Sequence, residues 1–177
     1  LALLGWALDA PGLATWTVDS RPMTPDAAAL SVVFGAVVGL TALRRPGRGV
    51  VRLATILCWV GTLAAVVLLW LPLLAVPSVA ALLGNSSPVT AFCFVLAGGS
   101  LLASRSRRAH ERWPGWLAWG FGGLVSSVGI AFLLAGVIDR RPAPVEGPTI
   151  FPAFTSSVVL LILGLALYSI TGQLEWI

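Results

Sequence analysis

The chain has 177 residues, of which 58% are hydrophobic and only 10% are charged, and its mean hydropathy is +0.95. A soluble domain carries about 25% charged and about 45–50% apolar residues, so this composition excludes an ordinary water-soluble globule, a disordered chain and a nucleic-acid-binding module. The net charge of +4 does not indicate nucleic acid, because the basic residues are arginines that gather mainly in two short clusters beside apolar runs.

Long apolar runs define the predicted elements. A helix that crosses a bilayer needs about 20 apolar residues at about 1.5 Å each. Five runs are predicted to span, the third being the shortest: Ala27–Leu43, Val50–Val76, Val89–Ala103, Trp116–Ile138 and Phe151–Ile170. A sixth run, Leu1–Leu8, is too short, and we interpret it as part of a truncated first helix because it lacks the features of a signal peptide. The sequence therefore predicts an all-α polytopic membrane bundle of about six helices, forming a single transmembrane domain over residues 1–177.

The arginines predict the topology of this bundle. Eight of them lie in two segments, between the second and third helices and between the fourth and fifth, where Glu111 is the only acidic residue. The opposite loops hold three arginines and five acidic residues. Because basic residues in short loops mark the cytoplasmic side, we expect Gly172–Ile177 to lie in the cytoplasm. The arginines given this topological role, with binding of anionic lipid headgroups as the alternative, include Arg44, Arg45, Arg48, Arg105, Arg107 and Arg108.

Three helix openings resemble one another and predict an internal repeat. Pro25, Pro88 and Phe154 each open an inward helix, and each is followed ten residues later by a glycine. Proline is accepted in the first turn of a helix because its missing N–H would have no intrahelical partner there. The repeat would consist of three αα-hairpins, whereas the alternative is coincidence, since proline and glycine punctuate many membrane helices. The predicted units are residues 1–45, 46–112 and 113–177.

These openings are similar to a motif of the form Met-x-Pro-Asn-Thr-Ala. Residues 23–28 (Met-Thr-Pro-Asp-Ala-Ala) and 88–91 (Pro-Val-Thr-Ala) match it in part, and residues 150–152 with Thr155 form a degenerate third copy. The chain thus resembles the N-terminal multi-pass membrane sensor region of bacterial sensor histidine kinases and diguanylate cyclases. The resemblance implies a location in the bacterial cytoplasmic (inner) membrane and PAS, kinase or cyclase modules following Ile177.

The apolar runs lack the residues that most membrane chemistry needs. They contain no Asp or Glu, and the only histidine, His110, lies in an arginine loop. Buried carboxylates serve proton relays and ion-coupled carriers, and a membrane haem needs axial ligands such as histidine. We therefore expect neither an enzyme nor a bound metal or cofactor within this chain.

The leading hypothesis is a membrane-embedded sensory domain that relays a stimulus to a C-terminal cytoplasmic effector. The alternative is a small transporter or an accessory, scaffolding subunit of a membrane complex. Residues 173–177 alternate polar and apolar in a way compatible with an amphipathic helix entering a dimer interface. The expected partners are the lipid bilayer, a second copy joined through a cytoplasmic extension, and a ligand of unknown identity, but no nucleic acid. The candidate ligand-binding positions, chosen by depth near the outer ends of the inward helices, are Pro25, Pro88, Thr90, Thr155, Trp59 and Trp70.

Several other side chains have a structural interpretation. Cys58 and Cys93 are expected to be small buried residues, with a disulfide as the alternative if their Cα atoms approach within about 7 Å. Trp59 and Trp119 are expected to pack in the core, with stacking on a ligand as the alternative. Hydroxyls within the apolar runs are expected to bond to their own helix, with a polar cavity as the alternative; they are Thr55, Thr62, Ser126, Ser127, Ser156 and Ser157.

Overall fold

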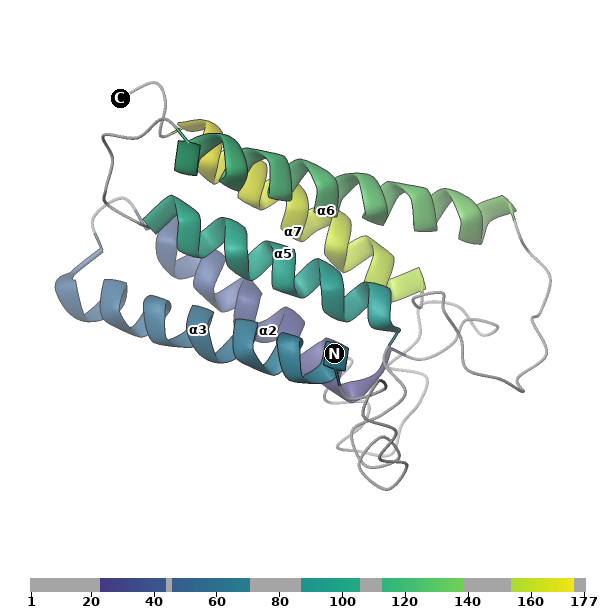
Figure 1. Ribbon diagram of the computed structural model, residues 1–177, viewed down its shortest axis with the longest axis horizontal. Helices are drawn as coiled ribbons and strands as arrows, with labels where there is room; N and C mark the ends of the chain where they lie inside the picture. Colours follow the sequence, from purple (N-terminus) through teal and green to yellow (C-terminus); the bar gives the residue numbers. More distant parts are fainter. Residues whose placement is uncertain (1–22, 44–45, 71–86, 106–112, 139–153, 174–177) are drawn as a thin grey trace.

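A computed structural model describes residues 23–43, 46–70, 87–105, 113–138 and 154–173 of the chain. Within these ranges the chain forms five α-helices and no strand (Figure 1). The helices are α2 (Pro25–Thr41), α3 (Arg48–Trp70), α5 (Pro88–Arg105), α6 (Trp113–Ile138) and α7 (Phe154–Gln173). The all-helical class is therefore confirmed, and each helix corresponds to one of the five predicted apolar runs. The predicted first helix, at Leu1–Leu8, lies outside the described residues.

The helix starts follow from local chemistry. Pro25 is the first residue of α2 and Pro88 is the first residue of α5, where a missing backbone N–H removes no intrahelical bond. Thr24 takes the extended backbone of an N-cap residue (φ −66°, ψ 147°), and its carbonyl accepts a bond from the Ala28 N–H at 3.0 Å. The side chain of Thr24 makes no capping bond to the backbone.

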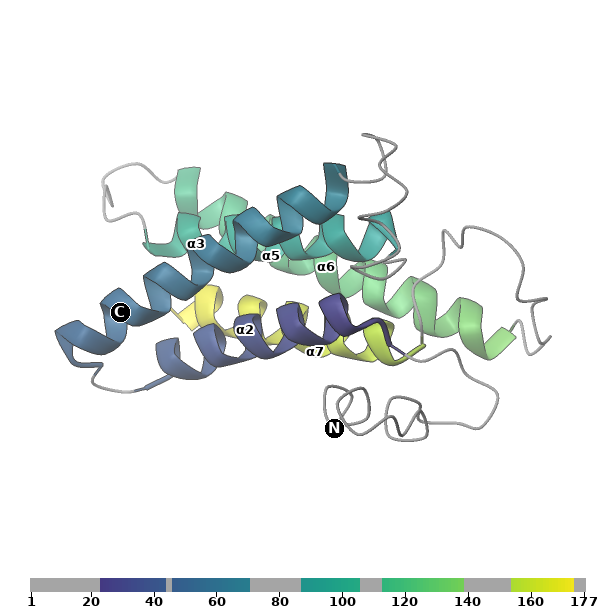
Figure 2. The ribbon, with the colours of Figure 1, turned by 90° about the horizontal axis from the view of Figure 1, so that it is seen from below.

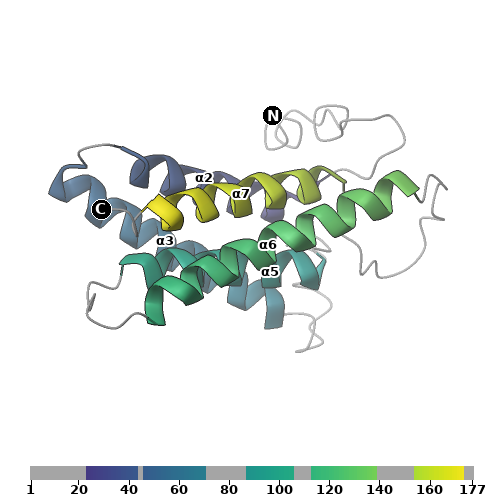
Figure 3. The ribbon, with the colours of Figure 1, turned by 90° about the horizontal axis from the view of Figure 1, so that it is seen from above.

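The five helices alternate in direction. α2, α5 and α7 run one way along the bundle, and α3 and α6 run the other way (Figures 1 and 3). Pro25, Pro88 and Phe154 consequently lie at the same end, which we call the proline end. α3 begins with Arg48 at the opposite end, which we call the arginine end.

α5 occupies the centre of the arrangement, since it contacts each of the other four described helices. α2 pairs with α3, and α6 pairs with α7. Figure 2 shows α2 beside α7, and Figure 3 shows α6 alongside α7. Each pair is thus joined to the other through α5 and through the α2–α7 contact.

Small residues let the helices approach closely. The interface between α6 and α7 is the clearest case: a Cβ added to Gly129 would lie 2.7 Å from the Leu161 nitrogen, and one added to Gly164 would lie 2.6 Å from the Ser126 nitrogen. Backbone therefore meets backbone across this interface, as is common where membrane helices associate through glycine and serine. Any side chain at either glycine would push the two helices apart.

The other half of the core is built around two aromatic rings. Phe34 of α2 and Phe94 of α5 stack with their centroids 5.5 Å apart and an interplanar angle of 11°, and both are fully buried. Gly61 of α3 faces the Phe34 ring, because a Cβ there would lie 3.4 Å from two ring atoms. This aromatic stack links α2, α3 and α5, whereas the α6–α7 interface is formed by small residues.

The outer surface of the bundle is apolar on every helix. Each described helix exposes large hydrophobic side chains, such as Val32, Ile56, Phe92, Leu134 and Ile162. Two helical segments, Arg48–Trp70 and Leu117–Ala135, are long and apolar enough to cross a membrane, and the other three helices are apolar but shorter. Water-soluble proteins rarely expose such extensive apolar patches.

Candidate functional site

Hydroxyl side chains gather inside the bundle at its proline end. Of the six buried polar residues in the described ranges, four lie at the start of α5 or of α7: Ser87, Thr90, Ser156 and Ser157. The first turns of α2, α5 and α7 converge on the same end, and each carries backbone N–H groups that have no intrahelical acceptor. The proline end therefore combines polar side chains with the partial positive charge of three helix starts.

A further hydroxyl at the proline end, that of Thr155 in the first turn of α7, is distinctive. The Thr155 oxygen is inaccessible to solvent and has no hydrogen-bond partner among the described residues. A buried hydroxyl without a partner costs about 1–3 kcal/mol, so such a group is a candidate for binding something else. At the start of α5, the Ser87 carbonyl accepts the ordinary first bond of the helix, from the Ala91 N–H at 3.2 Å.

Five of the six predicted ligand-binding residues lie at the proline end, four of them at helix starts and Trp70 at the end of α3. Thr90 is buried, Pro25 and Thr155 are partly buried, and Pro88 is exposed. The structure therefore brings these residues of α2, α5 and α7 to one end, and it buries Thr90 there while leaving Pro88 accessible. Ser156 and Ser157 were predicted only as possible lining of a polar cavity, and Ser87 was not predicted as a ligand-binding residue, although all three lie within three residues of a helix start.

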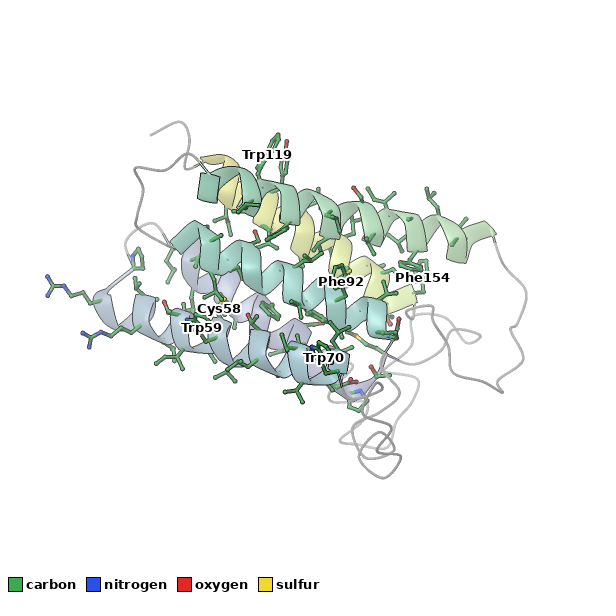
Figure 4. The ribbon with its side chains drawn as sticks, viewed as in Figure 1. Cys58, Trp59, Trp70, Phe92, Trp119 and Phe154 are labelled. Atoms are coloured by element: carbon green, nitrogen blue, oxygen red, sulfur yellow. The ribbon has the colours of Figure 1, made fainter. Side chains whose placement is uncertain are left out.

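The two tryptophans of the predicted site are not together. Trp70 ends α3 at the proline end and is 57% exposed, whereas Trp59 lies eleven residues earlier, about 16 Å away along the helix axis (Figure 4). Trp59 is 53% exposed and faces outward. The structure therefore does not bring Trp59 to the hydroxyl cluster.

The expectation that Trp59 and Trp119 pack in the core is wrong. Trp119 of α6 is 45% exposed and points away from the bundle, where it stacks on Tyr168 of α7 with ring centroids 4.7 Å apart (Figure 4). The expectation used the rule that large apolar side chains are buried, which holds in water. Inside this bundle the buried positions of α3 are taken by small residues, namely Ala54, Cys58, Gly61 and Ala65.

Two of the arginines assigned to topology are found within the described helices. Arg48 is exposed and begins α3, and Arg105 ends α5; both therefore lie at the arginine end, as the predicted topology requires. Arg52 follows Arg48 by one helical turn and is also exposed. The others given this role lie outside the described residues: Arg44, Arg45, Arg107 and Arg108.

Most hydroxyls in the middle of the helices bond to their own backbone, as predicted. The hydroxyls of Thr55, Thr62, Ser126 and Ser127 donate to the carbonyl four residues earlier, at 2.7–3.1 Å. Ser100 behaves differently, because its buried hydroxyl donates to the Ala118 carbonyl of α6 at 2.8 Å. This bond between α5 and α6 was not foreseen.

The two cysteines are buried and free, which confirms the structural interpretation and rules out the disulfide. The Cys58 thiol points to the Gly98 carbonyl of α5 at 3.8 Å. Within the described ranges no group of three histidine, cysteine or acidic side chains is placed to hold a metal ion. No protein-family model, curated protein or solved structure matches the chain.

Proposed function

We propose that the chain is a membrane-embedded sensory domain that relays a stimulus from the proline end to a cytoplasmic effector. In this proposal the arginine end faces the cytoplasm of a bacterium and the helices cross its inner membrane. The finer parts of the proposal are a sixth helix near the N-terminus, three repeated hairpins and a homodimer formed through a cytoplasmic extension. They rest on the sequence, and the parallel α2, α5 and α7 support the repeat.

The distribution of side chains supports the membrane part of the proposal. The interior combines small and hydroxylated residues with large apolar ones such as Phe34, Phe94 and Leu160, whereas further leucine, isoleucine, valine and tryptophan side chains cover the outside. Lipid chains solvate such a surface as well as a protein core would, so helix association must come from close packing and from hydrogen bonds between helices. The glycine contacts of α6 with α7 and the bond from Ser100 to α6 are contacts of these kinds.

The placement of α7 is the single observation that carries the relay. This helix has Thr155, Ser156 and Ser157 at the proline end and reaches Gln173 at the arginine end, about 30 Å away. Between these ends it contacts α2, α5 and α6. A ligand that favours one packing of the hydroxyl cluster over another would therefore displace the whole helix, because a ligand shifts an equilibrium by its different affinity for the two states.

The relay is tested by inserting one to four alanines after Gly172 in the full-length protein. Each residue rotates the following segment by about 100°, so effector activity should vary with insert length and recover near a full turn of 3.6 residues. The matched control places the same inserts after His110, in the segment between α5 and α6, where no periodic effect is expected. Activity that ignores insert length after Gly172, in protein that still reaches the membrane, would favour an anchoring or scaffolding role.

The site is tested separately with Thr155→Val. This change removes the buried hydroxyl but keeps its shape, so stability should be unchanged or slightly higher. We expect the response of the effector to its stimulus to fall while its basal activity stays the same. Thr55→Val is the control, because that hydroxyl already bonds to the Val51 carbonyl on α3. A normal response in Thr155→Val would remove this hydroxyl from the site.

A further inference from the structure

The outer face of α3 carries a continuous line of exposed side chains. On a helix with about 100° per residue, its members fall within an arc of about 80°. They face away from the small residues that α3 buries against its neighbours. We call this line the α3 stripe, and it consists of Arg48, Arg52, Ile56, Trp59 and Leu63.

The positive end of the α3 stripe favours an anion. Arg48 and Arg52 are exposed, lie one turn apart, and have no acidic residue in the first turn of α3. The only acidic residue in the described ranges is Asp26, which lies at the opposite end of the bundle. In addition, both cations sit at the helix end where the backbone dipole is itself positive, which is unfavourable unless a negative charge is nearby.

The rest of the α3 stripe is apolar and has the length of one leaflet. Ile56, Trp59 and Leu63 are 60%, 53% and 58% exposed. From Arg52 to Leu63 the stripe extends about 16 Å along the axis, which is close to half of the roughly 30 Å hydrocarbon core of a bilayer. A free phosphate would use the arginines alone, so the apolar continuation indicates a ligand with a long hydrocarbon chain.

We propose that the α3 stripe binds one anionic phospholipid. The phosphate lies between Arg48 and Arg52, whose guanidinium groups each offer paired N–H donors that match phosphate oxygens. One acyl chain follows Ile56 and Leu63 and contacts the Trp59 ring. This inference rests on the membrane location proposed above, and it names a lipid of the cytoplasmic leaflet as a ligand of the outer face.

The first test compares spin-labelled phosphatidylglycerol with spin-labelled phosphatidylcholine around the full protein reconstituted in phosphatidylcholine. At low salt, where surface charges are little screened, the wild type should hold the anionic lipid at least about tenfold more tightly. The double variant R48Q/R52Q should lose most of this preference. The control R107Q/R108Q removes the same charge from the other arginine segment and should keep it. An equal loss in both double variants would overturn the proposal in favour of general surface charge.

The second test uses the wild-type arginines and does not depend on how their variants fold. Phosphatidylglycerol brominated on its acyl chains, at a few mole per cent in phosphatidylcholine, should quench the fluorescence of Trp59 more than brominated phosphatidylcholine does. Subtracting the signal of Trp59→Phe isolates this residue, and Trp119→Phe gives the control, because Trp119 is similarly exposed on α6 but lies outside the stripe. Equal quenching of Trp59 by both lipids would overturn the lipid site and leave the membrane location intact. Quenching by neither lipid would refute both.

Discussion

Replacing Gly129 by alanine should destabilise the contact between α6 and α7. The added Cβ would lie 2.7 Å from the Leu161 nitrogen and 3.0 Å from its Cα, about 0.7 Å short of ordinary van der Waals contact. These are backbone atoms, so the conflict is relieved only if the two helices separate or shift. Overpacking of this kind costs about 1–3 kcal/mol. The loss of packing would extend along the α6–α7 interface, because separating the helices at Gly129 also disturbs the equally close approach of Gly164 to Ser126.

Gly123 provides the matched control for this substitution. It lies on the same helix, and a Cβ added there would meet nothing within 4 Å. Both changes bring the same gain in helix propensity of up to about 1 kcal/mol, so the difference between the two variants isolates the steric term. We expect Gly129→Ala to unfold at a lower mole fraction of sodium dodecyl sulfate in mixed micelles, with a difference in unfolding free energy of about 1–3 kcal/mol. Equal stability of the two variants would refute the close approach of α6 and α7.

Three further predictions concern packing and topology. Ser100→Ala removes the hydroxyl that donates to the Ala118 carbonyl and should lower the unfolding free energy by about 0.6 kcal/mol in the same titration; no change would mean that the bond does not contribute. Phe34→Ala removes one ring of the buried stack and should cost about 3–5 kcal/mol, measured as loss of folded protein on heating in mild detergent, and a loss below 1 kcal/mol would contradict the central position of this stack. Single cysteines at Ser106 and Pro144, in a background without the native cysteines, should be labelled from opposite sides of intact cells, and only Pro144 should react with an impermeant reagent; equal labelling of both would contradict the predicted topology.

The sequence predicted the helices better than their contacts. Each described helix begins or ends within a few residues of an apolar run, because a run of apolar residues bounded by proline or arginine has few alternatives to a helix. Pro25 and Pro88 mark two starts directly. The structure places Pro25, Pro88 and Thr155 at one end, since equal spacing from a helix start implies equal depth in helices that run the same way, but it leaves Trp59 in the middle of α3; their role in binding a ligand stays a prediction.

The contacts between helices depend on which face each helix turns toward the core. In these apolar runs the hydrophobic periodicity does not encode that face. Where nearly every side chain is apolar, hydrophobic periodicity no longer separates the inner face from the outer face. Trp59 was therefore expected inside and lies outside. The spacing of small residues, such as Ala54, Cys58 and Ala65 on α3, was the better indicator of the buried face. Predicting the bond from Ser100 to α6 would have required the position of α6 along α5, and no local sequence pattern gives that position.

The central position of α5 has a consequence for the order in which the chain assembles during synthesis. α2 and α3 emerge from the ribosome before the other described helices, but the ring that stacks on Phe34 belongs to α5, so this pair must wait for α5 before its core is complete. Of the described helices, α6 and α7 are made after α5, and their closest contacts are with each other, at Gly129 and Gly164. The α6–α7 hairpin then docks on a template that already contains α5, and a ribosome that pauses before α5 would leave an incompletely packed α2–α3 pair exposed to quality-control proteases.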